Sequence, residues 1–202
     1  TQVPFMYQFY EEYCRAQAEK NRLRALPRID STVVHDFSSN DYLGLSMHPD
    51  VIDAAAEAAR HWGVGSTGSR LLSGNNRLTE AFEAQIAQDK ETEAALIFCS
   101  GYQANMTVLA SLLHKRVLNA PPLVFFDRLN HSSLYSALFL SGAEYVLFEH
   151  NDMDDLQRQL EKHGAASRPA FIVAETVHGM DGDLLPLAHM ADIAAEYKCF
   201  LY

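Results

Sequence analysis

The chain has 202 residues, and 48% of them are hydrophobic, which is enough to bury a core and excludes an intrinsically disordered protein. Sixteen basic side chains against 26 acidic ones give a formal net charge of −10, and no stripe of Lys and Arg interrupts the acidity. Nucleic acid is therefore not an expected partner, because binding phosphates normally requires clustered basic residues.

No stretch approaches the roughly 20 consecutive apolar residues that a membrane span requires, so no membrane span is expected. The three cysteines, Cys14, Cys99 and Cys199, are far apart and odd in number, and they show neither a disulfide framework nor a zinc spacing. We expect them to be buried thiols of a protein that works in the reducing cytoplasm.

Residues 1–47 are expected to form an N-terminal arm and lead-in segment, with a charged amphipathic helix that Pro27 ends. A second helix is predicted from His48, because Pro49 suits a first helical turn. Residues 63–77 contain four of the ten glycines, together with serines and asparagines. This composition predicts a loop that needs freedom of φ.

Helices and strands alternate in the rest of the chain. A helix capped by Thr79 comes first, and four apolar runs are then predicted to be strands: residues 95–98, 123–127, 145–148 and 170–175. Amphipathic helices are predicted from Gln103, over 129–140, over 154–164 and from Pro186. Apolar strands separated by such helices indicate an α/β fold with a mainly parallel sheet and helices on both faces.

The last five residues, KCFLY, have the apolar and aromatic character of the start of a further strand. A domain seldom ends inside a buried strand. We therefore expect residues 48–202 to be an incomplete large domain, and the chain to be part of a longer polypeptide.

Ligands of open parallel sheets bind beyond the carboxyl ends of the strands, where CSGYQ, DRLNHSS and ETVHGMDGD are expected. Ser100, Gly101 and Tyr102 lie at a helix start, where free N–H groups and the helix dipole favour an anion such as phosphate. A plain helix cap by Ser100 explains the same residues, and by itself it is the favoured interpretation. A hydrolase elbow is disfavoured, because it requires G-x-S-x-G and both outer glycines are missing.

His131 in DRLNHSS is the candidate for contact with a planar ligand. Its imidazole can stack on a ring or exchange protons. The alternative is a partly buried histidine beside the residue that caps the next helix, which is expected to be Asn130, Ser132 or Ser133. Taken alone, His131 fits both interpretations equally well.

His178 and Asp181 in ETVHGMDGD raise the same question, since their glycine-rich turn can be a simple crossover. No pair of these histidines has the spacing of a metal site with a nearby carboxylate, so no metal is expected. Arg70, Arg22 and Arg24 are basic groups in an acidic chain, and each is able to bind a carboxylate or phosphate.

The order of several motifs resembles the α-oxoamine synthases, which are pyridoxal-phosphate (PLP) enzymes of the aspartate-aminotransferase fold (fold type I). The resemblance covers nearly everything after about residue 20 and rests on these segments: FSSNDYLGL (37–45), GVGSTGSRLLSG (63–74), IFCSGYQAN (97–105), RLNHSS (128–133), EHND (149–152) and ETVHGMDGDLLPL (175–187). It implies that the chain is the N-terminal part of the large domain of that fold.

The resemblance implies a PLP site. The backbone at Ser100, Gly101 and Tyr102 would hold the cofactor phosphate, and the imidazole of His131 would stack on the pyridine ring as a catalytic residue. Glu175 would belong to the loop beneath the cofactor.

The resemblance also implies a substrate side of the site. Asn40 would lie near the carboxylate of the amino acid, and Ser69 lies in the loop 65–74, which would border the acyl-CoA entrance near a homodimer interface. Arg22 or Arg24 resembles basic residues that meet the acyl substrate in some members.

The activity implied is a decarboxylative condensation of an amino acid with an acyl-CoA, most like 8-amino-7-oxononanoate synthase in biotin synthesis. A serine palmitoyltransferase-like or a glycine-using member is the alternative within the family, and a non-catalytic relative or regulatory subunit is the alternative outside enzymes. Position 179 is glycine where relatives often have serine, and the Schiff-base lysine is expected beyond residue 202.

Overall fold

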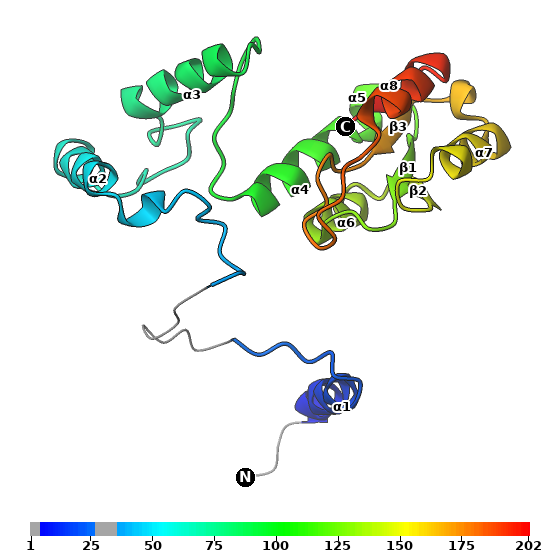
Figure 1. The fold of residues 1–202 in the computed structure, drawn as a ribbon, viewed down its shortest axis with the longest axis horizontal. Helices are drawn as coiled ribbons and strands as arrows, with labels where there is room; N and C mark the ends of the chain where they lie inside the picture. The colour runs from blue at the N-terminus through cyan, green and yellow to red at the C-terminus, as the bar shows by residue number, and fades with distance from the viewer. Residues whose placement is uncertain (1–4, 27–35) are drawn as a thin grey trace. The chain divides into compact units, whose positions relative to one another are not determined.

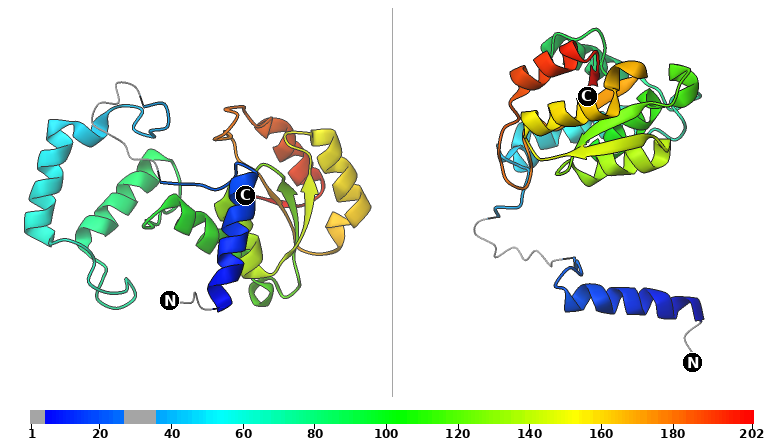
Figure 2. Two further views of the ribbon diagram at one scale, coloured as in Figure 1. Left: turned by 90° about the horizontal axis from the view of Figure 1, so that it is seen from below. Right: turned by 90° about the vertical axis from the view of Figure 1, so that its right-hand side faces the viewer.

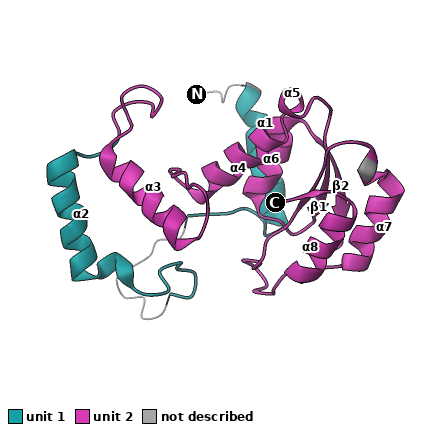
Figure 3. Cartoon of the chain, turned by 90° about the horizontal axis from the view of Figure 1, so that it is seen from above, with its two compact units in different colours: residues 1–65 teal, residues 66–202 magenta. Residues whose placement is uncertain are grey.

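The computed structural model describes residues 5–26 and 36–202, and the chain divides into two compact units, residues 1–65 and 66–202 (Figure 3). The expected division of the chain after residue 47 stays a prediction. Within the described ranges, no helix combines the length and the apolar character that crossing a bilayer requires.

The described residues of the first unit form three helical elements, which are α1 (Phe5–Glu19), the 3-10 turn η1 (Leu45–Met47) and α2 (Pro49–Trp62) (Figure 1). The first helix ends at Glu19, while Pro27, which was predicted to end it, lies outside the described residues. The predicted second helix is confirmed, with Pro49 in its first turn. Gly63 ends it with a φ of 80°, a conformation that strains other residues.

The second unit contains the predicted alternation of helices and strands (Figure 1). Its helices are α3 (Arg77–Asp89), α4 (Gly101–Leu112), α5 (Lys115–Leu118), α6 (Ser132–Ser141), α7 (Met153–His163), the 3-10 turn η2 (Ala165–Ser167) and α8 (Leu187–Glu196). Its strands are β1 (Leu123–Asp127), β2 (Glu144–Phe148), β3 (Ala170–Val173) and β4 (Phe200–Leu201). They form a four-stranded sheet in the order β2-β1-β3-β4, and every pairing is parallel.

Helices cover both faces of this sheet, as predicted, because successive residues of a strand point to opposite sides. In β1, Leu123 and Phe125 belong to a core cluster with residues of α7 and α8, whereas Val124 and Phe126 belong to a cluster with residues of α4 and α6. All four side chains are fully buried. Figure 2 shows the two pairs of helices on opposite sides of the strands.

α3 begins at Arg77, so the prediction that Thr79 caps this helix is wrong. Asn76 has an extended backbone, and its Oδ1 accepts the N–H of Thr79 at 2.9 Å. An asparagine in this position satisfies one of the free donors of the first turn as well as a threonine would. Thr79 therefore lies inside the helix.

Residues 95–98 do not form a strand, which corrects the prediction. No other segment of the described chain pairs with them, and the N–H of Ile97 donates to the carboxylate of Glu83 at 2.8 Å instead. A strand requires a neighbour for its backbone donors and acceptors, so apolar composition was not sufficient to predict one.

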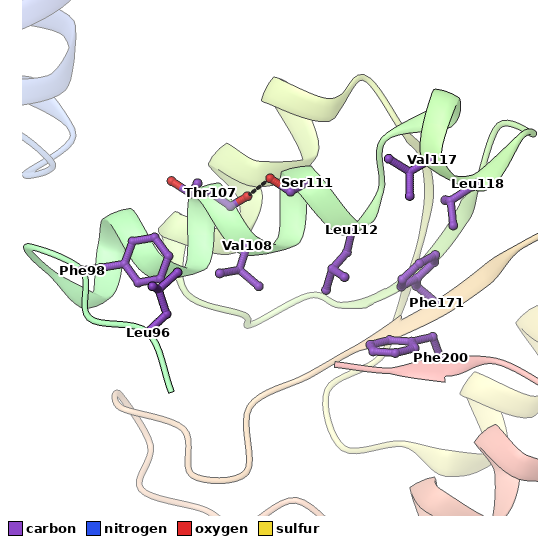
Figure 4. Close-up of a pocket in the computed structure, with 10 residues that line it drawn as sticks. All are labelled: Leu96, Phe98, Thr107, Val108, Ser111, Leu112, Val117, Leu118, Phe171 and Phe200. Carbon is purple, nitrogen blue, oxygen red and sulfur yellow. Dashed lines mark hydrogen bonds between the residues drawn. The ribbon is translucent and has the colours of Figure 1, made fainter. Parts of the chain in front are cut away.

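The same segment lines an apolar cavity of about 580 Å³ beside α4 and the edge of the sheet (Figure 4). Leu96 is 64% exposed and Phe200 of β4 is 52% exposed. Large apolar side chains of this cavity are therefore accessible to solvent. The other residues that line it are Phe98, Thr107, Val108, Ser111, Leu112, Val117, Leu118 and Phe171.

The prediction of three buried thiols is also wrong. Cys14 and Cys99 are exposed and Cys199 is half-buried, and all three are free. Cys14 lies on α1, where other described side chains are exposed too, and Cys99 belongs to the unpaired segment before α4. Only Cys199 packs against a core cluster, and burial raises the pKa of its thiol to about 11.

Candidate cofactor site at the edge of the sheet

The order of the strands reverses at β1. The chain passes from β1 to β2 on one side and then returns to β3 on the other side of β1. In an open parallel sheet, such a switch point leaves a crevice beyond the carboxyl ends of the two strands. The segments that leave β1 and β3 here are residues 128–131 and 174–178, so two of the three predicted loops meet at the switch point.

The start of α4 has the form of an anion site. The hydroxyl of Ser100 accepts the N–H of Gln103 at 3.1 Å, and its carbonyl accepts the N–H of Ala104 at 3.0 Å. Ser100 is therefore the N-cap, as one interpretation of the sequence held. Within the described part of the chain, the amides of Gly101 and Tyr102 have no acceptor, and a Cβ added at Gly101 would meet no heavy atom within 4 Å.

His131 itself caps α6, so the expectation that Asn130, Ser132 or Ser133 does so is wrong. The Nδ1 atom of His131 accepts the N–H of Ser133 at 3.2 Å and lies 2.7 Å from the Ser133 hydroxyl. An imidazole nitrogen is an acceptor as good as a hydroxyl for the free N–H groups of a first turn. The ring is nevertheless exposed, so one residue both caps the helix and faces the crevice.

Tyr102 connects the start of α4 to the start of α6. Its ring lies edge-on to the ring of His131, with 6.3 Å between the centroids, and its hydroxyl is 2.5 Å from that of Ser136. The structure therefore brings the predicted residues Ser100, Gly101 and Tyr102 to the same place as His131.

Glu175 and Asn130 fasten the segment that carries His131. The backbone N–H of His131 donates to the carboxylate of Glu175, which follows β3. The side-chain amide of Asn130, which is 5% exposed, donates to the carbonyl of Val173 at 2.8 Å. Glu175 is thus brought together with the other predicted cofactor residues, and both contacts join the ends of β1 and β3.

A buried network next to the site was not predicted. The carboxylate of Asp127, at the end of β1, accepts from His150 Nδ1 at 2.9 Å and from the N–H groups of Leu129 and Asn151 at 2.9 and 3.1 Å. The Nε2 atom of His150 lies 2.9 Å from the carboxylate of Asp183. The imidazole therefore joins the end of the sheet to the loop before α8.

Two opposing effects act on the pKa of His150. Burial lowers this pKa, but the carboxylates of Asp127 and Asp183 outweigh burial and raise it above its ordinary value of 6.5. His150 is thus favoured as an imidazolium between two acids. Its position could have been found from the sequence, since Asp127 ends one predicted strand, EHND follows the next, and the carboxyl ends of neighbouring parallel strands share one edge.

His178 lies next to this network, and its Nε2 atom has no hydrogen-bond partner among the described residues. It is 3% exposed, and its ring lies 4.0 Å from that of His150, edge to face. Among the described residues, Asp127, His150 and His178 bring metal-ligating atoms within 4.8 Å of one another. Both nitrogens of His150 already bind carboxylates, so these contacts are accounted for as hydrogen bonds. Asp181 is exposed on the same loop.

The loop before α3 is held by Arg70. Its guanidinium binds both carboxylate oxygens of Glu83, at 2.5 and 2.8 Å, so Arg70 is already engaged by an acid of this unit. The hydrogen bond from Arg70, followed by that from the N–H of Ile97, lowers the pKa of Glu83 to about 2. Ser69 of the same loop lines a cavity of about 760 Å³ that extends to Cys99 and Gln103 at the start of α4.

The other predicted substrate residues are in the first unit. Asn40, Arg22 and Arg24 are all exposed there, whereas His131 belongs to the second unit, so their proximity to His131 stays a prediction. Gly179 lies in the second unit, where a Cβ added to it would meet no heavy atom within 4 Å. A serine would therefore fit at this position.

Residues 32–202 match the model of the aminotransferase class I and II family. A curated protein of Paramagnetospirillum magneticum, provisionally named as an 8-amino-7-oxononanoate synthase, is 46% identical over 175 residues, which are 87% of this chain and 45% of that protein. The chain thus spans about half the length of the curated relatives it matches.

Solved structures agree with this match. Serine palmitoyltransferase of S. paucimobilis, with bound PLP and myriocin, has a TM-score of 0.74 and 31% identity over 80% of this chain and 39% of its own. An 8-amino-7-oxononanoate synthase of Francisella tularensis has a TM-score of 0.64 and 26% identity over 78% of this chain and 42% of its own. The chain therefore belongs to the aminotransferase class I and II family, with α-oxoamine synthases as its relatives.

Proposed function

We propose that the protein containing this chain is a PLP-dependent acyltransferase that condenses an amino acid with an acyl-CoA and releases carbon dioxide. One observation carries the proposal: a helix start with two free amides and an exposed imidazole lie together at the switch point of the sheet. The names of the relatives from P. magneticum and F. tularensis support 8-amino-7-oxononanoate synthesis, a step of biotin synthesis, as the specific activity.

The described residues suit both the phosphate group and the pyridine ring of PLP. The free amides of Gly101 and Tyr102, at the positive end of α4, suit the phosphate, and the missing Cβ of Gly101 lets the backbone approach it closely. The exposed face of the His131 imidazole suits the pyridine ring. When bound, PLP supplies the electron sink that stabilises negative charge at the α-carbon of an amino acid.

The role of the chain's own residues is to hold the cofactor and to orient the substrate. His131 would stack on the ring, and its Nε2 would be free to donate to the carboxylate of the incoming amino acid. Glu175 fixes the backbone of His131, and Tyr102 limits how far the imidazole can tilt, because its own hydroxyl is bound to Ser136. Small displacements of these groups are costly, since catalysis depends on the alignment of the reacting atoms.

The substrates are proposed from the cavity and from the relatives. The cavity of about 760 Å³ that Ser69 lines begins beside the α4 helix start, and it has room for part of an acyl chain. We propose that Asn40 meets the amino-acid carboxylate and that Arg22 or Arg24 meets the acyl substrate. The active form is proposed to be a homodimer in the cytoplasm.

Serine palmitoyltransferase activity is a second candidate, because the similarity to that structure, with a TM-score of 0.74, exceeds the 0.64 of the oxononanoate synthase. A direct comparison distinguishes the two. The full-length protein is assayed for thiol release with alanine and pimeloyl-CoA, and with serine and palmitoyl-CoA. We expect turnover with the first pair and a large loss of it in His131→Ala. Turnover with the second pair alone would favour the second candidate, and turnover with neither pair would contradict the proposal.

A further inference from the structure

Three polar side chains form a line from α4 to the exposed ring of His131. The side-chain amide of Asn105, in α4, donates to the hydroxyl of Ser133, in α6, at 3.0 Å. That hydroxyl lies 2.7 Å from Nδ1 of His131. Ser133 is fully buried, so water does not compete for these hydrogen bonds.

The backbone determines which nitrogen of His131 can hold a proton. Ser133 is the second residue of α6, and its N–H has no acceptor within the helix. Nδ1 of His131 accepts that N–H at 3.2 Å. A proton on Nδ1 would leave a buried N–H without a partner and would place two donors against each other at the positive end of the helix.

Asn105 determines the direction of the Ser133 hydroxyl. The amide N–H of Asn105 uses a lone pair of Ser133 Oγ, so the hydroxyl hydrogen is available for Nδ1 of His131. Both the N–H and the O–H of Ser133 then point at the same ring nitrogen. Neutral imidazole carries one proton, and that proton must lie on the other nitrogen, Nε2.

We infer that Asn105 and Ser133 are positioning residues that hold His131 as the tautomer with its proton on Nε2. No residue in the described ranges binds Nε2, so its N–H is free to donate to an anionic group of a ligand above the site. The role of this donor rests on the proposed function, in which the ligand is the carboxylate of an amino acid bound to PLP. The tautomer itself does not depend on that function.

Histidine-selective ¹⁵N NMR of the full-length protein tests the inference, with the His131 signals assigned by their loss in His131→Gln. We expect the wild-type protein to carry the proton on Nε2. Ser133→Ala should lower the ratio of the Nε2–H to the Nδ1–H tautomer about 3- to 10-fold, the effect of one hydrogen bond. Asn105→Asp should shift it in the same direction, because a carboxylate accepts the Ser133 hydroxyl hydrogen and turns an oxygen lone pair toward Nδ1.

Ser132→Ala is the matched control, since Ser132 is the exposed neighbour and the ring of His131 forms its hydrogen bonds with Ser133 instead. It should leave the His131 spectrum unchanged. A wild-type proton on Nδ1 would overturn the inference, and so would a His131 spectrum that is the same in Ser133→Ala, Asn105→Asp and wild type. Asn105→Asp keeps the test valid if Ser133→Ala does not fold.

Measurements of turnover and PLP binding show whether a failed test refutes this inference or the proposed function. If the protein binds PLP and His131→Ala loses activity, we expect Asn105→Asp to lower kcat about 3- to 10-fold with its PLP absorbance retained. If Asn105→Asp then left both the tautomer of His131 and kcat unchanged, the positioning role of Asn105 and Ser133 would be refuted and the proposed function would stand. A wild-type protein that binds no PLP would refute the proposed function, while the NMR spectra would still decide the tautomer.

Discussion

Replacing Asp127 by asparagine tests the network that joins β1 to the loop before α8. The carboxylate accepts His150 Nδ1 and two backbone N–H groups, and the side chain is 0% exposed. Asparagine offers one acceptor oxygen instead of two and has no charge. We expect the free energy of unfolding to fall by about 3–5 kcal/mol, the range for breaking a buried ion pair.

The loss should depend on pH in a defined direction. The pKa of His150 is raised in the folded protein, so its charge stabilises the fold below the ordinary value of 6.5, and this contribution is lost as the pH rises through the raised pKa. The difference between wild type and Asp127→Asn is therefore largest below pH 6.5 and smaller in alkali. It does not vanish there, because neutral His150 still donates to Asp127.

Urea unfolding of the full-length protein at a series of pH values measures both effects. Asp154→Asn is the control, because Asp154 is an exposed acid of the first turn of α7, and it should change stability by no more than about 0.5 kcal/mol. If Asp127→Asn unfolded at the same urea concentration as the wild type over the whole series, the account of this network would be refuted.

Two further predictions concern the loop before α3. Gly74→Ala should destabilise the unit by about 1–3 kcal/mol in urea unfolding, because its Cβ would lie 1.9 Å from the carbonyl oxygen of Gly68. Gly179→Ala, with no heavy atom within 4 Å of the new Cβ, is the matched control, and equal stability of the two variants would contradict this packing. ¹³C NMR titration of the full-length protein should give Glu83 a pKa of about 2 that rises toward 4.5 in Arg70→Met, and the ion pair with Arg70 should therefore weaken only as the pH falls from 4.5 toward 2. Arg77→Met, which removes an exposed arginine of α3, should leave this pKa low, whereas an ordinary wild-type pKa would count against the bidentate contact.

Local signals in the sequence were sufficient where short-range interactions decide the structure. Ser100 before a helical pattern and Pro49 at a first turn predicted helix starts that the structure contains. The apolar runs of β1, β2 and β3 predicted parallel strands, of which β1 and β3 are buried throughout while β2 is buried only at Phe148, and KCFLY predicted β4.

Strand pairing and local backbone conformation decided the elements that were predicted wrongly. Residues 95–98 are as apolar as β1, but a strand also requires a paired neighbour, which the sequence of the segment does not encode. Thr79 and Asn76 are both good capping residues, and only the backbone conformation at Asn76 distinguishes them. His131 caps α6 through a local contact with Ser133, which its sequence position next to three other capping residues did not single out. The contacts of His150 with Asp127 and Asp183 join distant segments, so the fold was needed to bring these groups together.

The proposed function requires that the start of α4 and His131 form a PLP site. The visible absorption spectrum of the full-length protein, purified with added PLP and dialysed, shows whether this site binds PLP. We expect a protein-bound PLP band that changes on addition of alanine, and weaker retention of PLP in His131→Ala. A wild-type protein that shows no such band after dialysis would contradict the proposed function.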